Sequence, residues 1–170
     1  MKRFVLFPDR FISSAYAIDY EKLYAEGYRG IIWDIDNTLV PHDAPADSRS
    51  RELMDRLRSI GFHTCVVSNN REPRVKSFCD DAGVECYVFK ASKPSEKGYI
   101  EAMEKMGTKR ESTIAIGDQI FTDVWGARRQ NIYCIMVGQV KKWAERPTII
   151  LKRIIEVPIL LCYRLIYHDN

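Results

Sequence analysis

The chain has 170 residues, of which 46% are hydrophobic and 29% charged, as expected for one folded domain with its own core. Its net charge of +3 is too small to indicate a nucleic-acid-binding protein, whose Lys and Arg residues usually form a dominant patch. No stretch of about 18 apolar residues is present, so no segment is expected to span a membrane.

The cysteine pattern favours a reducing compartment. The cysteines are odd in number, scattered, and form no C-x-x-C pair, which argues against a disulfide framework or a zinc site. The apolar start of the chain is interrupted at Pro8, well short of the apolar core of a secretory signal. We therefore expect a cytoplasmic protein. The five cysteines are Cys65, Cys79, Cys86, Cys134 and Cys162.

Residues 1–29 carry no strong period and are interpreted as a lead-in segment with a short helix over 20–26. After Gly30, short apolar runs bounded by Gly alternate with stretches of helical spacing. The first such helix is expected to begin at an N-cap at Asp47-Ser48 and to stop at Gly61. The later helices are predicted over 74–82, 95–106 and 123–130. The predicted strands are 31–33, 63–67, 84–89, 112–116 and 133–137.

Strands that alternate with helices indicate parallel pairing through right-handed crossovers. The sequence therefore predicts an α/β fold, a three-layer α/β/α sandwich with a central parallel sheet over residues 30–140. The remaining residues, 141–170, are predicted to form a C-terminal amphipathic tail.

Polar side chains follow four successive predicted strands. Asp34 and Asp36 follow the first, Ser68 the second, Lys93 the third, and Asp118 with Asp123 the fourth. Because ligands of open parallel sheets bind beyond the carboxyl ends of the strands, we expect these side chains to converge at one edge.

Phosphoryl transfer is the chemistry that these residues favour. Asp34 and Asp36 are two apart, so in extended chain they project to the same side, where one carboxylate attacks phosphorus and the other handles the leaving-group proton. Two acids so close predict a hard cation, Mg²⁺, with Asp34, Asp36 and Asp118 as its protein ligands.

The other polar residues are predicted to hold the phosphate or to support the site. Ser68 offers a hydroxyl donor, and Lys93 supplies positive charge where negative charge builds up in the transition state. Asp123 is expected to orient Lys93 or a metal-bound water. The candidate phosphate-binding residues are Thr38, Ser68, Asn69 and Lys93.

These motifs resemble those of the haloacid dehalogenase superfamily. The segment from Asp34 to Leu39 resembles its D-x-D-x-T motif, and Ser68 and Lys93-Pro94 resemble its second and third motifs. Gly117-Asp118 followed by Asp123 resembles the fourth. The resemblance covers residues 30–140 and implies that Asp34 is a nucleophile forming an aspartyl-phosphate and Asp36 the general acid/base. It also implies that Thr38 supports the loop and that the Asp36 backbone carbonyl is a metal ligand.

The gaps between the motifs leave no room for a cap domain, so the chain is similar to the capless subclass III. It also resembles the YqeG family, which is related to mitochondrial phosphatidylglycerophosphate phosphatases. The resemblance implies a phosphorylated substrate, either a small molecule or a lipid head group. Two other interpretations stay open: a receiver-type regulatory domain, and a non-catalytic member of the superfamily that serves in binding.

The C-terminal residues 148–167 combine apolar positions with nearby Lys and Arg and predict a helix that Pro158 would kink or divide. This helix is expected either to pack on the core or on a second copy in a homo-oligomer, or to lie on an anionic membrane surface as a peripheral contact. In the second case the protein would be membrane-associated.

Overall fold

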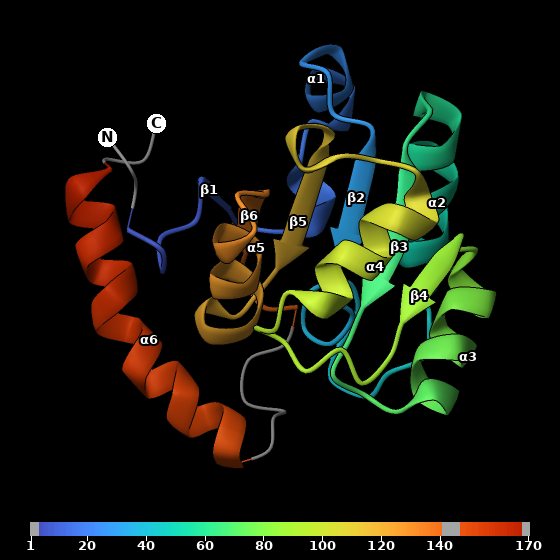
Figure 1. The fold of residues 1–170 in the computed structure, drawn as a ribbon. Helices are drawn as coiled ribbons and strands as arrows, with labels where there is room; N and C mark the ends of the chain where they lie inside the picture. Colours follow the sequence, from blue (N-terminus) through green and yellow to red (C-terminus); the bar gives the residue numbers. More distant parts are fainter. Residues whose placement is uncertain (1–3, 141–146, 168–170) are drawn as a thin grey trace.

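The computed structural model describes residues 4–140 and 147–167 and contains a six-stranded sheet with helices on both faces (Figure 1). The strand order is β1-β6-β5-β2-β3-β4, and every neighbouring pair is parallel. The predicted α/β sandwich is confirmed. The strands are β1 (Arg10–Ile12), β2 (Gly30–Trp33), β3 (His63–Val67), β4 (Cys86–Val88), β5 (Thr113–Gly117) and β6 (Tyr133–Val137).

Each observed helix begins and ends within two residues of the predicted one. Asp47 caps the second helix by accepting a hydrogen bond from the Ser50 N–H at 2.8 Å, and Gly61 ends it in the left-handed conformation at φ 108°. The helices are α1 (Tyr20–Ala25), α2 (Ser48–Ile60), α3 (Glu72–Ala82), α4 (Lys97–Met106), α5 (Trp125–Arg129) and α6 (Pro147–Ile166).

The lead-in segment contributes a strand that the sequence did not predict. β1 has three residues and pairs with β6 at one edge of the sheet, with Phe11 opposite Met136. Three residues are too few to show a period of two, so only the tertiary structure identifies this strand.

Alternate residues of β2 face two separate cores. Ile31 and Trp33 pack with side chains of α1, α2 and α3, whereas Ile32 packs with side chains of α4 and α5. Burial on both faces explains why this strand is a continuous apolar run instead of an alternating one. β2 is therefore an inner strand of the sheet that is covered by helices on both faces.

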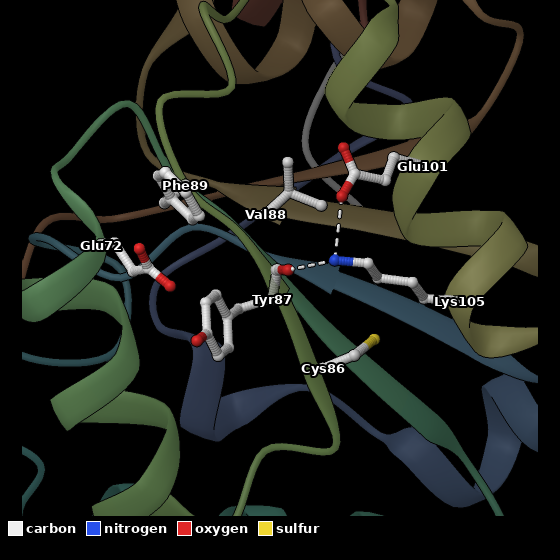
Figure 2. A pocket seen from close by; sticks show the side chains of 7 residues that line it. All are labelled: Glu72, Cys86, Tyr87, Val88, Phe89, Glu101 and Lys105. Carbon is white, nitrogen blue, oxygen red and sulfur yellow. Dashed lines mark hydrogen bonds and ion pairs between the residues drawn. The ribbon is translucent and has the colours of Figure 1, made fainter.

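The opposite edge of the sheet, at β4, is protected by α4. Lys105 donates a hydrogen bond to the Tyr87 carbonyl oxygen at 2.8 Å and pairs with Glu101 at 2.8 Å (Figure 2). These residues line a hollow of about 450 Å³ together with Cys86 and Phe89. A short edge strand covered by a lysine is a usual protection against pairing with another chain.

The C-terminal helix α6 lies along the side of the molecule that carries α5 (Figure 1). It runs unbroken through Pro158 and is not divided there. The missing Pro158 N–H removes the hydrogen bond to the carbonyl four residues earlier, at Ile154, a residue that is 63% exposed. Within the described residues, no helix combines the length and hydropathy that crossing a membrane requires.

Candidate active site

The candidate site lies at the carboxyl edge of the three central strands. β2 sits between β3 and β5, and the chain leaves it toward β3 on one side and returns as β5 on the other. The Asp34 N–H bonds the Ile116 carbonyl at 3.0 Å, so Asp34 is aligned with the end of β5. Such a switch point is where open parallel sheets bind ligands.

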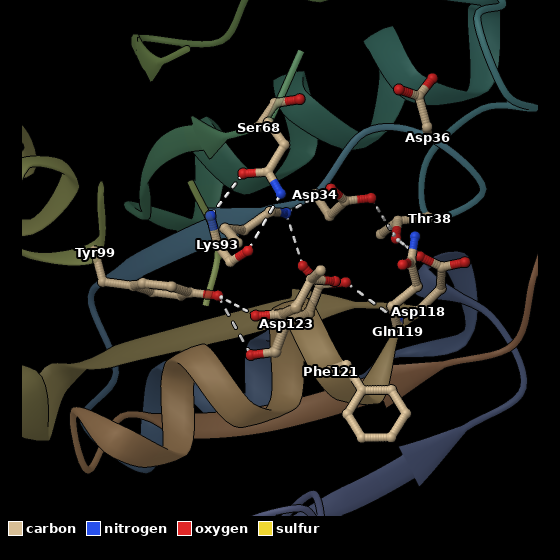
Figure 3. Close-up of polar contacts among 12 residues, drawn as sticks. Asp34, Asp36, Thr38, Ser68, Lys93, Tyr99, Asp118, Gln119, Phe121 and Asp123 are labelled. Carbon is tan, nitrogen blue, oxygen red and sulfur yellow. Dashed lines mark hydrogen bonds and ion pairs between the residues drawn. The ribbon is translucent and has the colours of Figure 1, made fainter. Parts of the chain in front are cut away.

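A tight loop after β2 turns Thr38 back toward this edge. The backbone N–H groups of Thr38 and Leu39 bond the Ile35 carbonyl at 3.2 and 2.9 Å, and Asn37 takes a positive φ of 62° that Asn tolerates well. The Thr38 hydroxyl oxygen lies 3.3 Å from Asp34 Oδ2 and 3.3 Å from Asp118 Oδ1. Thr38 therefore links the acids that follow β2 and β5 (Figure 3).

Lys93 joins two of the acids. Its Nζ lies 2.6 Å from Asp34 Oδ1 and 2.7 Å from Asp123 Oδ1 (Figure 3). Burial alone would lower the pKa of Lys93, but the carboxylates of Asp123 and Asp34 outweigh it and raise this pKa well above its usual range. The lysine is therefore a fixed positive charge at neutral pH.

Asn69 holds the backbone at Lys93. Its Oδ1 accepts from the Lys93 N–H at 2.6 Å, and its Nδ2 donates to the Lys93 carbonyl at 3.3 Å. These two hydrogen bonds hold the Lys93 backbone against the Asn69 side chain. The neighbouring Ser68 is buried, and its Oγ accepts from the Asn70 N–H at 3.2 Å, which leaves the hydroxyl able to donate.

The Asp34 carboxyl is electrostatically unusual. Burial raises its pKa to about 7, against the opposing effect of Lys93, and the nearby Asp123 and Asp36 add to the increase. A divalent cation beside Asp34 would favour its ionised form at neutral pH. The site would therefore be stabilised by positive charge in addition to that of Lys93.

Asp123 belongs to a one-turn π-helix, Ile120–Val124, between β5 and α5. Its Oδ2 accepts from the Gln119 N–H at 3.1 Å. A Cβ at Gly117 would collide with the Asp123 carboxyl, so glycine is required for this approach. Next to Asp123 in the chain, the Thr122 carbonyl oxygen lies 3.2 Å from the Tyr99 hydroxyl, a contact that no sequence pattern indicated.

Three carboxylates form a group that fits a hard cation. Oxygen atoms of Asp34, Asp118 and Asp123 lie within 4.8 Å of one another. Carboxylate oxygens are ligands that Mg²⁺ prefers, and a buried group of three acids needs compensating positive charge. The sequence pointed to Asp34, Asp36 and Asp118. The structure adds Asp123 to this group and leaves the Asp36 carboxylate outside it.

The Asp36 side chain points away from Asp34 (Figure 3). It accepts from Asn70 Nδ2 at 2.6 Å, from Arg74 Nη2 at 3.0 Å and from the Asp43 N–H at 2.9 Å. The expectation that the two acids project to the same side assumed extended chain, but the tight loop begins between them. Sequence reasoning did not assign Asn70 or Arg74 to the site, although both follow Ser68 closely.

The chain belongs to the haloacid dehalogenase-like hydrolases, whose family model matches residues 42–131. It is 40% identical to "Probable phosphatase YqeG" of Bacillus subtilis (strain 168), over 82% of this chain and 81% of that protein. It is 26% identical to "Phosphatidylglycerophosphate phosphatase 1, chloroplastic/mitochondrial" of Arabidopsis thaliana, over 88% of this chain but only 45% of that protein. The chain thus spans less than half of the Arabidopsis relative.

Solved structures share the fold at low sequence identity. An uncharacterized protein from Listeria monocytogenes serotype 4b superimposes with a TM-score of 0.54 at 14% identity, over 70% of this chain and 86% of that one. One from Corynebacterium glutamicum ATCC 13032 gives 0.53 at 18% identity, over 74% and 93%. These similarities show the architecture and carry no information about substrate.

Proposed function

We propose that the chain is a Mg²⁺-dependent phosphatase that hydrolyses phosphate monoesters through an aspartyl-phosphate on Asp34. The observation that carries the proposal is the contact of Lys93 with Asp34 at 2.6 Å beside the carboxylates of Asp118 and Asp123. Membership of the hydrolase family and the name of the 40% identical Bacillus relative support the same activity.

In the first step, an Asp34 carboxylate oxygen attacks phosphorus while the bond from phosphorus to the leaving oxygen breaks, and Asp36 donates its proton to that oxygen. In the second step, Asp36 takes a proton from water, the water oxygen attacks phosphorus, and the bond to Asp34 breaks. Inorganic phosphate is released and Asp36 is again protonated. Asp36 must leave Arg74 and Asn70 for either proton transfer, because they hold it away from Asp34.

The other residues stabilise charge on the phosphoryl group. Lys93 presents a buried ammonium group beside the attacking carboxylate, and the Ser68 hydroxyl can donate to a phosphoryl oxygen. A Mg²⁺ ion held by Asp34, Asp118 and Asp123, with the Asp36 carbonyl as a further candidate ligand, would neutralise phosphate charge. The positive groups explain how an anionic nucleophile could approach an anionic substrate.

A lipid phosphate is the substrate class that we favour. The connections between β2 and β4 contain α2 and α3 and no inserted cap, so the site can admit a large substrate. The Arabidopsis relative is named for phosphatidylglycerophosphate, which makes this phospholipid the first candidate. Phosphorylated small molecules are the alternative.

The exposed surface of α6 supports contact with an anionic membrane from the cytoplasmic side. Eight of the nine exposed residues over 154–166 are apolar, and Arg164 is the exception. Arg164 lies on this exposed surface, so two copies facing each other there would bring like charges together, whereas anionic lipid would complement them. A homo-oligomer is therefore the weaker alternative. The basic residues Lys141, Lys142 and Arg146 lie outside the described residues.

The activity is tested by release of p-nitrophenolate from p-nitrophenyl phosphate with Mg²⁺. We expect EDTA to stop the release, added Mg²⁺ to restore it, and Asp34→Asn to abolish it, whereas Asp80→Asn, at an exposed position on α3, stays active. Hydrolysis that persists in Asp34→Asn would rule out the mechanism. An inactive but folded wild type would favour a non-catalytic binding domain.

A further inference from the structure

The C-terminal helix contributes one buried acid to the neighbourhood of the active site. Glu156 is 2% exposed, whereas the adjacent Ile155 and Val157 are 52% and 54% exposed. On the same inward side, Ile159 and Leu160 pack against the core that contains α4 and α5. These apolar contacts fix the helix while its single carboxylate faces the protein.

The Glu156 carboxylate binds the backbone between two members of the acidic group. Its Oε1 accepts from the Ile120 N–H at 2.7 Å and from the Phe121 N–H at 3.3 Å. Ile120 and Phe121 begin the π-helix that contains Asp123, and Asp118 lies two residues before its start. N–H groups in the first turn of a helix have no partner within that helix, so an external acceptor is needed where they are buried.

We infer that Glu156 is a positioning residue, which sets the geometry of Asp118 and Asp123 by fixing the backbone between them. The inference rests on the proposed function, because it concerns the same acidic site. It makes α6 part of the functional unit, although nine residues lie between the last sheet strand and the start of the helix. Bonds from backbone N–H to a carboxylate are among the stronger hydrogen bonds, so their loss should let the segment over 118–123 move.

The position of Glu156 also connects the outer surface of α6 to the acidic group. The residues on either side of it face outward, so anything that shifts the helix shifts the acceptor of Ile120 and Phe121. A purely structural role would instead predict that loss of Glu156 lowers overall stability and leaves the local geometry of the acids unchanged. Cation affinity separates the two roles, because partners outside the ligand set typically alter it about 10- to 100-fold.

The test uses the full chain with Glu156→Leu, which fills similar volume and removes the acceptor. Mn²⁺ affinity is measured by electron paramagnetic resonance of the free ion, and hydrogen exchange is measured by mass spectrometry. We expect Glu156→Leu to weaken Mn²⁺ binding about 10-fold or more and to speed exchange at 118–124 but not in β5. Leu161→Ser, an exposed position on the same helix, should change neither.

Glu156→Gln keeps an acceptor oxygen without the charge and guards against a Leu variant that does not fold. We expect it to fold, to bind Mn²⁺ about fivefold more weakly than wild type, and to show a smaller increase in exchange. Wild-type Mn²⁺ affinity and wild-type exchange at 118–124 in a folded variant would overturn the inference. If wild type binds Mn²⁺ but releases no phosphate, the proposed function fails while the inference about the acidic site stands.

Discussion

The Lys93 ammonium group lies 2.6 Å from the Asp34 carboxylate, although 59 residues separate them in the sequence. The lysine follows β4 and the acid follows β2, and β3 lies between these strands in the sheet. Lys93 therefore reaches across the carboxyl end of β3 to meet Asp34 and Asp123. This ion pair joins the loop between β4 and α4, which contains Lys93, to the proposed nucleophile Asp34.

Replacement of Lys93 is expected to cost both stability and activity. Lys93→Met would leave the carboxylates of Asp34 and Asp123 buried without their common partner, and such a loss typically costs about 3–5 kcal/mol. We expect a matching fall in the free energy of unfolding measured with urea in EDTA above pH 7, where Asp34 is ionised, and no measurable phosphatase activity.

Lys76→Met is the matched control, because the ion pair of Lys76 with Asp80 lies on an exposed helix face. It should unfold like wild type and keep its activity. A Lys93→Met protein as stable as wild type would show that the two acids do not depend on the lysine.

The raised pKa of Asp34 predicts a particular dependence of stability on pH in the metal-free protein. The folded carboxyl holds its proton up to about pH 7, whereas the unfolded one loses it near pH 3.8. Folding therefore takes up a proton at Asp34 between these two pH values. The contribution of Asp34 to the free energy of unfolding falls as the pH rises from about 3.8 to about 7.

Asp34→Asn has no such proton to lose. The difference between the thermal midpoint of Asp34→Asn and that of wild type should increase from roughly pH 5 to pH 7 and stay constant above pH 7. Circular dichroism in EDTA measures both midpoints. Leu161→Ser, an exposed position without a titratable group, should show no such trend. A constant difference between Asp34→Asn and wild type across this range would contradict the raised pKa.

Asp36→Asn is expected to separate the two chemical steps. A p-nitrophenolate leaving group needs no proton, so the first step should proceed and release about one equivalent in a burst. The second step needs a base for water, so turnover should then slow about 10²- to 10⁴-fold. Acid quenching should trap the phosphorylated protein.

An alkyl phosphate such as glycerol 3-phosphate should give no burst with Asp36→Asn, because its leaving oxygen requires the proton. Equal slowing of both substrates without accumulation of phosphorylated protein would show that Asp36 is not the general acid/base. Rapid-quench measurement with ³²P-labelled substrates distinguishes these results.

Membrane contact is expected to depend on the exposed side chains of α6. Sedimentation with vesicles should show binding to mixed phosphatidylglycerol and phosphatidylcholine and little binding to phosphatidylcholine alone. Replacing Leu161 and Leu165 together by Ser removes apolar surface and should weaken this binding about 10-fold or more.

Phe89→Ser is the control, since Phe89 is exposed just after β4, and β4 and α6 lie on opposite sides of the molecule (Figure 1). It should bind vesicles like wild type. Light scattering that shows a dimer in solution, lost in the Leu161 and Leu165 variant, would instead assign the α6 surface to a second copy of the chain.

The sequence by itself determined most of the sheet and the candidate acids. Short apolar runs ending in Gly, Asp or Ser marked β2, β3, β5 and β6, because strands buried on both faces must be apolar throughout. The rule that ligands of parallel sheets bind beyond the carboxyl ends of the strands then groups Asp34, Lys93, Asp118 and Asp123 from the sequence alone.

Only the tertiary structure decided which side chains share which partner. A loop that turns after Asp34 sends Asp36 to Arg74 and Asn70, and neither local propensity nor spacing fixes such a choice. The three-residue β1 and the buried Glu156 depend equally on distant chain segments. Strand identity follows from local burial patterns, whereas hydrogen-bond partners are settled by the packing of elements far apart in the sequence.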